Sequence, residues 1–115
     1  MLKRENRLTK NRYFQYIYKK GEKVSSQNIT IVYTSTKLRP IKVGVTVSNK
    51  VGDAVTRNKI KRRIRAIIAE NIDKINKKYN YIIVVRPSIV ELDFYGIKKE
   101  LSYLFKKGQF INENF

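Results

Sequence analysis

The chain has 115 residues and contains neither cysteine nor histidine, which excludes disulfides, the usual zinc sites and the usual nucleophile–base pairs. Its 26 lysines and arginines stand against 9 acidic residues, and the formal net charge of +17 at pH 7 makes a compact chain repel itself. A bound polyanion would remove that repulsion. We therefore expect a nucleic acid as the partner, with an anionic membrane surface as the second candidate.

One domain over residues 1–115 is the simplest organisation for a chain of this length. The start, MLKREN, is basic and lacks the apolar stretch of a secretory signal. The longest aliphatic run, residues 82 to 85, is too short to span a bilayer. The sequence therefore predicts a soluble, cytoplasmic protein without a membrane partner.

The first predicted element is a helix over residues 9–21. Thr9 or Asn11 can cap its start, and Gly21 can end it. Its apolar side chains recur at helical spacing and share one face: Tyr13, Phe14, Ile17 and Tyr18.

Two strands follow. Residues 28–35 are rich in β-branched side chains, and residues 36–40 form a turn that contains Pro40. Residues 41–48 alternate, which predicts one face toward a core and one small, polar face. The core face carries Ile41, Val43, Val45 and Val47, and the polar face Lys42, Gly44, Thr46 and Ser48.

A second helix is predicted from about residue 54 to residue 78, capped by Asp53, and a buried strand over residues 81–86. A last helix ends at Gly108 and begins either at a capping box, Ser88 with Glu91, or at Phe94 after Asp93. The order α-β-β-β-α-β-α, with one of the three strands left open, predicts an α+β fold: a two-layer sandwich with helices on a small mixed sheet.

The second helix carries a dense basic segment: six of the nine residues from Arg57 to Arg65 are basic and none is acidic. On a wheel of about 100° per residue, one side is apolar: Ile60, Ile64, Ile67, Ile68, Ile72 and Ile75. The adjacent arc carries Asn58, Lys61, Arg62 and Arg65, with Arg57 near the helix start and Lys59 and Arg63 further toward solvent. Cations at a helix start gain nothing from the macrodipole, so this arc indicates an external anion. A merely solvated charged face would normally carry interleaved carboxylates.

Two other features concern chemistry. Phe14 and Tyr18, one turn apart, either belong to the core or line a groove in which nucleotide bases stack, and the sequence leaves both open. The carboxylates are few and scattered, whereas a two-metal nuclease needs several that converge. We therefore predict no catalytic residue, no metal ligand and no cofactor held by this chain.

The segment AVTRNKIKRRIR, residues 54–65, resembles the arginine-rich signature of the bacterial ribonuclease P protein component. The preceding VGVTVSNKVGDAV resembles that family's strand and loop, RYFQYIYKKG its first helix and YIIVVRP its last strand. The similarity runs from about Arg7 to Lys107 in the same order of elements.

This resemblance implies that the basic helix forms a left-handed crossover between parallel strands, against the general right-handed preference. It also implies two partners, a catalytic RNA subunit and the 5′ leader of precursor tRNA, and no obligate protein partner. The metal-dependent hydrolysis that releases the leader would belong to the RNA, with Mg²⁺ at the RNA active site.

By the family's motif, the residues that match the signature facing the catalytic RNA are Arg57, Asn58, Lys61, Arg62 and Arg65. Phe14 and Tyr18 match aromatic positions in the leader-binding cleft, whose floor would carry Lys42, Thr46 and Ser48, with Gly44 leaving room for backbone. The chain departs from the family's common residues at Asn49, Asp53 and Lys59.

Two other classes compete with this reading. One is a structural RNA-binding protein such as a ribosomal component, without a role in cleavage. The other is a DNA-binding module whose basic helix enters a major groove, against which the isoleucine face and the lack of dimer signals argue. In each case we expect the free chain to be marginally stable and to gain stability from bound anions.

Overall fold

The computed structural model describes residues 2–115 and contains one four-stranded mixed sheet in the order β1-β2-β4-β3. The strands are β1 (Glu22–Ser25), β2 (Ile29–Ser35), β3 (Val43–Thr46) and β4 (Tyr79–Val85). β2 pairs antiparallel with both β1 and β4, whereas β3 runs parallel to β4. The predicted α+β fold with a small mixed sheet is confirmed.

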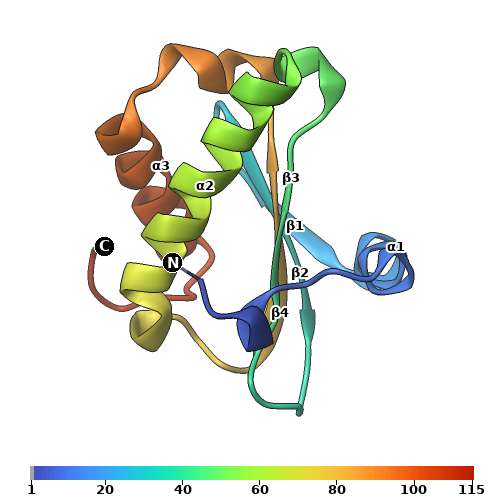
Figure 1. Cartoon of the computed structure of the whole chain (residues 1–115). Helices are drawn as coiled ribbons and strands as arrows, with labels where there is room; N and C mark the ends of the chain where they lie inside the picture. The colour runs from blue at the N-terminus through green and yellow to red at the C-terminus, as the bar shows by residue number, and fades with distance from the viewer. Residues whose placement is uncertain (1) are drawn as a thin grey trace.

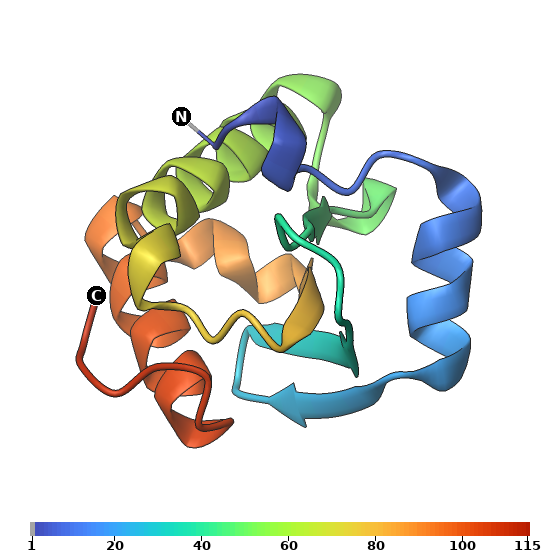
Figure 2. The ribbon, with the colours of Figure 1, turned by 90° about the horizontal axis from the view of Figure 1, so that it is seen from below.

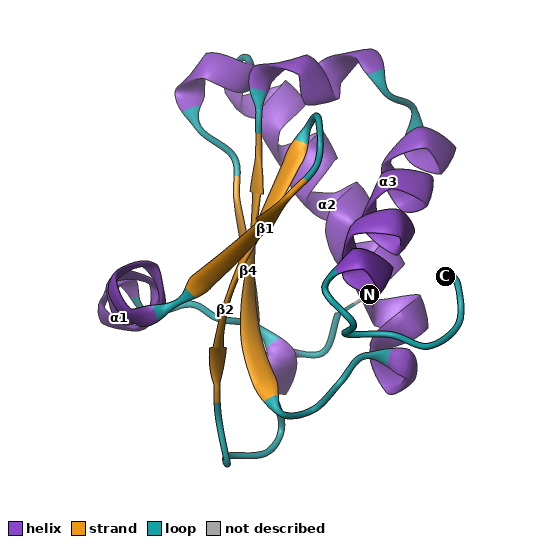
Figure 3. Cartoon of the chain, turned by 180° about the vertical axis from the view of Figure 1, so that it is seen from behind, coloured by secondary structure: helices purple, strands orange, loops and turns teal. Residues whose placement is uncertain are grey.

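The helices lie on both sides of this sheet. α2 (Ala54–Asn71) and α3 (Phe94–Lys107) cover one face, and α1 (Asn11–Lys20) lies against the other (Figures 1 and 3). Seen along the strands, α1 crosses the sheet from the N-terminal segment beside β3 to the start of β1 (Figure 2). α1 therefore divides the exposed part of that face into two sides.

α2 connects the parallel strands β3 and β4, and this crossover is left-handed, as the family resemblance implies (Figure 1). Its apolar side packs on the sheet through the buried Ile60, Ile64, Ile67 and Ile68. The rest of the helix surface is therefore held at a fixed orientation on the outside of the molecule.

The core alternates along the strands. Ile31 of β2 and Ile83 of β4 point to the large cluster under α2 and α3, whereas Val32 and Ile82 join the smaller cluster under α1. The predicted core face of residues 41–48 is confirmed, because the large cluster includes Ile41, Val43, Val45 and Val47.

The N-terminal segment pairs with the start of β3 at the free edge of the sheet. Leu8 donates its backbone N–H to the carbonyl oxygen of Val43 over 3.1 Å, and Arg7 pairs with Val43 in a single parallel bridge. This contact brings Arg7 to the same side of the molecule as α2.

The predicted order of elements is confirmed, and the strand that the sequence left open is β1. One predicted boundary is wrong, because α2 ends at Asn71 and not near residue 78. The buried side-chain amide of Asn71 donates back to the carbonyl of Ile67 over 2.8 Å, and residues 72–74 form a 3₁₀ turn. Ile75 still reaches the core, but from the connection that leads to β4.

The helix starts follow capping chemistry in two of three cases. Asp53 accepts the Thr56 N–H and Asp93 the Gly96 N–H, each over 2.8 Å, so α2 and α3 begin as predicted, α3 by the second of the two alternatives. The residues before Asp93, Pro87–Glu91, form a 3₁₀ helix. α1 differs: its N-cap position is occupied by Lys10, and no side chain caps it.

Gly21 ends α1 as predicted, with its N–H bound to the Ile17 carbonyl over 2.7 Å. The reason for glycine is close approach, because a Cβ there would lie 2.4 Å from the Ile17 oxygen and 2.9 Å from Val32. α1 can therefore turn directly into β1 while lying against β2.

Candidate nucleic-acid interface

The basic arc predicted on α2 lies on the surface of the molecule. Asn58 and Arg62 are exposed, and Lys61 and Arg65 are half-buried. Half-burial of a long cationic side chain covers its stem and keeps its charged end accessible. The arc therefore presents several hydrogen-bond donors to one side of α2.

Arg57 is tied to the loop that precedes α2. Its Nη1 donates to the Gly52 carbonyl over 2.6 Å, and Gly52 has a φ of 157°, which disfavours any side chain there. The guanidinium thus closes the turn into the helix. Its remaining donors make no hydrogen bond with the described residues.

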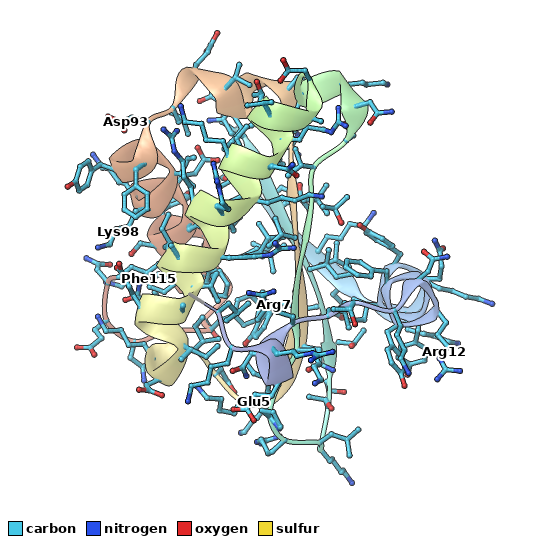
Figure 4. All side chains as sticks on the ribbon, viewed as in Figure 1. Glu5, Arg7, Arg12, Asp93, Lys98 and Phe115 are labelled. Atoms are coloured by element: carbon cyan, nitrogen blue, oxygen red, sulfur yellow. The ribbon has the colours of Figure 1, made fainter. Side chains whose placement is uncertain are left out.

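Arg65 lies close to a second arginine, Arg7, which the sequence did not indicate as part of the site. Burial first, and then the charge of Arg7, hold the pKa of Arg65 below its ordinary value. Arg7 extends from the N-terminal segment toward α2, and its Nε donates to the Leu2 carbonyl over 3.1 Å (Figure 4). Two like charges at one place form a favourable position for an anion such as phosphate.

The outer arc differs in one respect from the expectation. Lys59 is exposed, as expected, whereas Arg63 is half-buried. Of the two outer-arc cations, Lys59 is therefore the one whose side chain faces solvent.

The cations of α2 have no acidic partners within the described part of the chain. Between side chains of residues 2–115, the structure contains a single ion pair within 4 Å, from Lys98 to Glu70 at 3.8 Å. That pair links α3 to α2, and Figure 4 shows Lys98 on α3, away from Arg7. The cations of the basic arc thus form no ion pair with the described residues, although the charge of Arg57 helps to lower the pKa of Asp53.

The aromatic side of α1 meets β3. A Cβ on Gly44 would lie 2.7 Å from two ring carbons of Phe14, so the absence of a side chain lets the ring lie on the strand. The room at Gly44 that we expected to admit RNA backbone is therefore filled by Phe14. Phe14 is half-buried and packs against the small cluster that contains Leu8.

Tyr18 is fixed beside it. Its hydroxyl lies 3.0 Å from Oγ1 of Thr46 in a hydrogen bond, and its ring centroid lies 6.5 Å from that of Phe14. Both rings are half-buried, so each has one part against the protein and another part open to solvent. Together with Thr46 they form a half-buried aromatic surface where α1 meets β3, which we call the Phe14–Tyr18 groove after the cleft expected there.

The predicted floor of the leader cleft does not lie in one place. Thr46 belongs to the groove, and Ser48 is exposed just beyond the end of β3. Lys42 precedes the opposite end of β3 and donates to the Glu5 carbonyl. Phe14 on Gly44 lies between the two ends, so Lys42 faces the other side of α1, where it lines a separate pocket.

No set of three or more Asp or Glu side chains within residues 2–115 is arranged to hold a metal ion. No helix in the same range is long and apolar enough to cross a membrane. Asp53, the acidic residue nearest the basic arc in sequence, is engaged as a helix cap.

Comparisons with known proteins agree over almost the whole chain. The sequence profile of the family described as Ribonuclease P matches residues 2–109. The ribonuclease P protein component of Bacillus pumilus is 37% identical over 108 residues, which cover 93% of this chain and 91% of that protein.

Solved structures give the same result. The RNase P protein of Staphylococcus aureus superposes with a TM-score of 0.87 at 31% identity, covering 93% of this chain and 98% of that chain. The RNase P protein of Thermotoga maritima superposes with a TM-score of 0.80 at 28% identity, covering 88% and 96% respectively. The likeness therefore includes α1, the sheet, the crossover helix and α3.

Proposed function

This chain belongs to the ribonuclease P protein family, and we propose that it is the protein subunit of a ribonucleoprotein endonuclease that removes the 5′ leader from precursor tRNA. The observation that carries the proposal is the basic arc of α2, which forms no ion pair with the described residues and is held outward by the isoleucines that fix the helix to the sheet. A catalytic RNA subunit would neutralise this arc with its phosphates.

In this proposal the RNA contact is made by the predicted residues Arg57, Asn58, Lys61, Arg62 and Arg65. Guanidinium groups match phosphate oxygens with two parallel hydrogen bonds, and the amide of Asn58 can donate and accept at a ribose hydroxyl or a base. Arg7 adds a second guanidinium beside Arg65. The arc would fix the position of the protein on the RNA without itself reading much sequence.

The leader of the precursor would bind in the Phe14–Tyr18 groove. Every base has a π-face, so stacking on these rings tolerates variation in leader sequence. Thr46 holds the Tyr18 ring in place, and Ser48 adds an exposed hydroxyl beyond it. The groove would then favour precursor over mature tRNA, which has no leader.

The hydrolysis is assigned to the RNA in this proposal. Mg²⁺ at the RNA active site would supply the activated water and stabilise the leaving oxygen. The carboxylates of this chain do not fit a metal site of that kind, because none gather in a group of three within residues 2–115. The protein contributes binding and orientation of the substrate.

The test is reconstitution of the purified protein with its cognate catalytic RNA and a precursor tRNA at low magnesium. We expect faster cleavage at the mature 5′ end than with RNA alone. Binding to the RNA without any gain in cleavage would instead support the structural RNA-binding class. Binding of duplex DNA in preference to this RNA would support the third class.

A further inference from the structure

α1 has a second exposed side, and a pocket of about 890 Å³ opens there. It lies between α1, the end of β2, the β2–β3 loop and the N-terminal segment. Neither Phe14 nor Tyr18 contributes to its lining, because both rings face β3 on the other side of the helix. Its volume lies in the range of sites that hold small ligands, about 300–1,000 Å³. We call it the α1 pocket.

The α1 pocket is strongly cationic. No Asp or Glu of the described chain is among the residues that line it. Figure 4 shows Arg12 extending from α1 toward the end of the molecule that carries the β2–β3 loop. Arg7 also borders the pocket, but its side chain reaches toward α2, so the cations of the pocket come from the N-terminal segment, α1 and the β2–β3 loop: Lys10, Arg12, Lys37 and Lys42.

Two exposed tyrosines share this lining. Tyr13 is 47% exposed and Tyr16 is 58% exposed, so a large part of each ring is open to solvent. The Arg12 guanidinium lies 5.1 Å from the Tyr13 ring centroid and the Lys10 ammonium 6.0 Å. Cationic side chains and exposed aromatic rings thus lie next to one another at this site.

Uncommitted polar groups complete the pocket. The N-terminus of α1 has no side-chain cap and no acidic residue in its first turn, so its first N–H groups remain available to an anion. Asn80 uses its side-chain oxygen to accept the Lys42 N–H over 2.8 Å, and its amide nitrogen makes no hydrogen bond within residues 2–115. The cations and the backbone N–H groups can therefore bind a phosphate. The tyrosine rings can stack on a nucleotide base, and the Asn80 amide can donate a hydrogen bond to the polar edge of that base.

We propose that the α1 pocket binds a nucleotide of single-stranded RNA, separately from the Phe14–Tyr18 groove. Arg12 and Lys10 contact the phosphate, and a base stacks on Tyr16 or Tyr13. This rests on the proposed function only in that the partner is RNA. An acidic peptide would satisfy the cations but leave the exposed rings without a stacking partner, so the combination favours RNA.

The first experiment uses the purified protein and a short fluorescent oligouridylate at fixed salt. Tyr16→Ala should weaken binding about 5- to 150-fold, the range that corresponds to loss of one stacked base. The matched control is Tyr103→Ala, which removes a tyrosine with the same 58% exposure from α3. Arg12→Gln is compared in the same way with Lys99→Gln, because Lys99 is exposed on α3.

An abasic oligonucleotide separates the two kinds of contact. Arg12→Gln should weaken its binding, whereas Tyr16→Ala should not, because only the base requires the ring. All four side chains are exposed, so melting temperatures of the variants should equal that of the parent. Equal losses at Tyr16 and Tyr103, or none at either, would overturn the proposal. Displacement of the oligonucleotide by polyglutamate with the same dependence on Tyr16 would assign the pocket to acidic peptides instead.

A holoenzyme experiment identifies the source of the nucleotide. If the leader supplies it, Tyr16→Ala weakens binding of precursor tRNA with a long leader but not with a truncated one. If the catalytic RNA supplies it, Tyr16→Ala weakens assembly and leaves the preference for precursor unchanged. If Tyr16→Ala changes neither precursor binding nor assembly, the α1 pocket binds no nucleotide in the holoenzyme. Failure of the parent protein itself to stimulate cleavage would count against the proposed function and leave the oligonucleotide result standing.

Discussion

Arg7 of the N-terminal segment places its positive charge close enough to Arg65 of α2 to lower the pKa of Arg65, second only to the effect of burial. Two cations that repel one another in the free protein attract a shared anion. The two arginines therefore contribute to the electrostatic repulsion within the folded protein that the formal net charge of +17 implies.

The first prediction follows from this pair. Titrating sulfate against chloride at matched ionic strength should raise the melting temperature, because an ion that binds only the folded state stabilises it by mass action. At about 100 times its Kd the gain is about 2.7 kcal/mol. Arg65→Gln should melt no lower than the parent without sulfate and should respond less to it. The control is Lys99→Gln, and a parent protein indifferent to sulfate would contradict the prediction.

The second prediction separates specific contacts from diffuse charge on α2. Arg62→Ala and Arg65→Ala should each weaken assembly with the catalytic RNA by about 1.5–3 kcal/mol, the range for a charge-assisted hydrogen bond. Lys59→Ala and Arg63→Ala should weaken it less, and Lys59 is the cleaner comparison because Arg63 is half-buried.

Equilibrium binding at several salt concentrations measures both affinity and the number of phosphate contacts. Each lost contact should reduce the salt slope by about 0.7–0.9. Equal losses of affinity at all four positions would mean that the segment acts only through its overall positive charge, without specific contacts.

The third prediction concerns Phe14, which rests on Gly44. Phe14→Ala should weaken binding of precursor tRNA to the holoenzyme by about 1–3 kcal/mol and leave mature tRNA unaffected. Because the ring is half-buried, folding should lose less than the ~3–5 kcal/mol typical of a fully buried phenylalanine. Gly44→Ala keeps the ring but displaces it, and should impair precursor binding in the same direction.

Melting of both variants comes before the binding assays. If Phe14→Ala unfolds, its ring is structural and the leader assignment fails at this residue. If both variants stay folded and distinguish precursor from mature tRNA as the parent does, the leader binds elsewhere on the protein.

The fourth prediction isolates the hydrogen bond between Tyr18 and Thr46. Tyr18→Phe and Thr46→Val should each destabilise the fold by about 0.5–1.5 kcal/mol, and the double variant by little more than either one. Denaturant unfolding of the parent and the three variants measures this coupling. Tyr18→Phe retains the ring, so precursor binding should change little. Fully additive losses would show that the contact contributes nothing to holding α1 on β3.

The fifth prediction is a pH dependence at Asp53. The hydrogen bonds with Thr56 hold the pKa of Asp53 below its usual value. Since the folded-state pKa lies below that of the unfolded chain, about 3.9, the carboxylate stabilises the fold above that pH. This contribution is lost as the pH falls through the folded-state pKa. Asparagine caps helices without titrating, so any advantage of the parent over Asp53→Asn should shrink on acidification.

Melting curves of both proteins at neutral pH and near pH 3 provide the measurement. Asp53→Asn also removes a negative charge next to the basic arc, and we expect slightly tighter binding to RNA. A stability difference between the two proteins that stays constant with pH would show that the Asp53 charge plays no part.

Local patterns allowed much of the fold to be predicted. The alternation of residues 41–48 identified the buried face of β3, and Asp53 identified the start of α2, because both signals depend on near neighbours. The third strand of the predicted order could not be located, because β1, with the sequence EKVS, is short, largely exposed and paired only with β2 in a hairpin. The end of α2 was missed because the isoleucine pattern continues to Ile75 although the helix stops at Asn71.

The site was predicted less completely, because it depends on how distant segments meet. The spacing along β3 grouped Lys42 with Thr46, but α1 crosses the strand at Gly44 and separates them. Arg7 was not selected, since nothing in its local sequence shows that the N-terminal segment pairs with Val43 and reaches α2. Tyr13 was predicted to share an apolar face with Ile17, and of these two Ile17 is buried, whereas Tyr13 is exposed and lines the α1 pocket.

The pairing of the N-terminal segment with β3 has a consequence for self-association. An open sheet edge is a template on which another chain can add a strand. While the protein is free, its charge keeps copies apart, but a bound polyanion would cancel that repulsion. The N-terminal segment already pairs with the first residue of β3, Val43, and the opposite edge is the short β1 with its exposed Lys23. Both edges are therefore poor templates for an added strand, even when a bound polyanion has cancelled the charge of the protein.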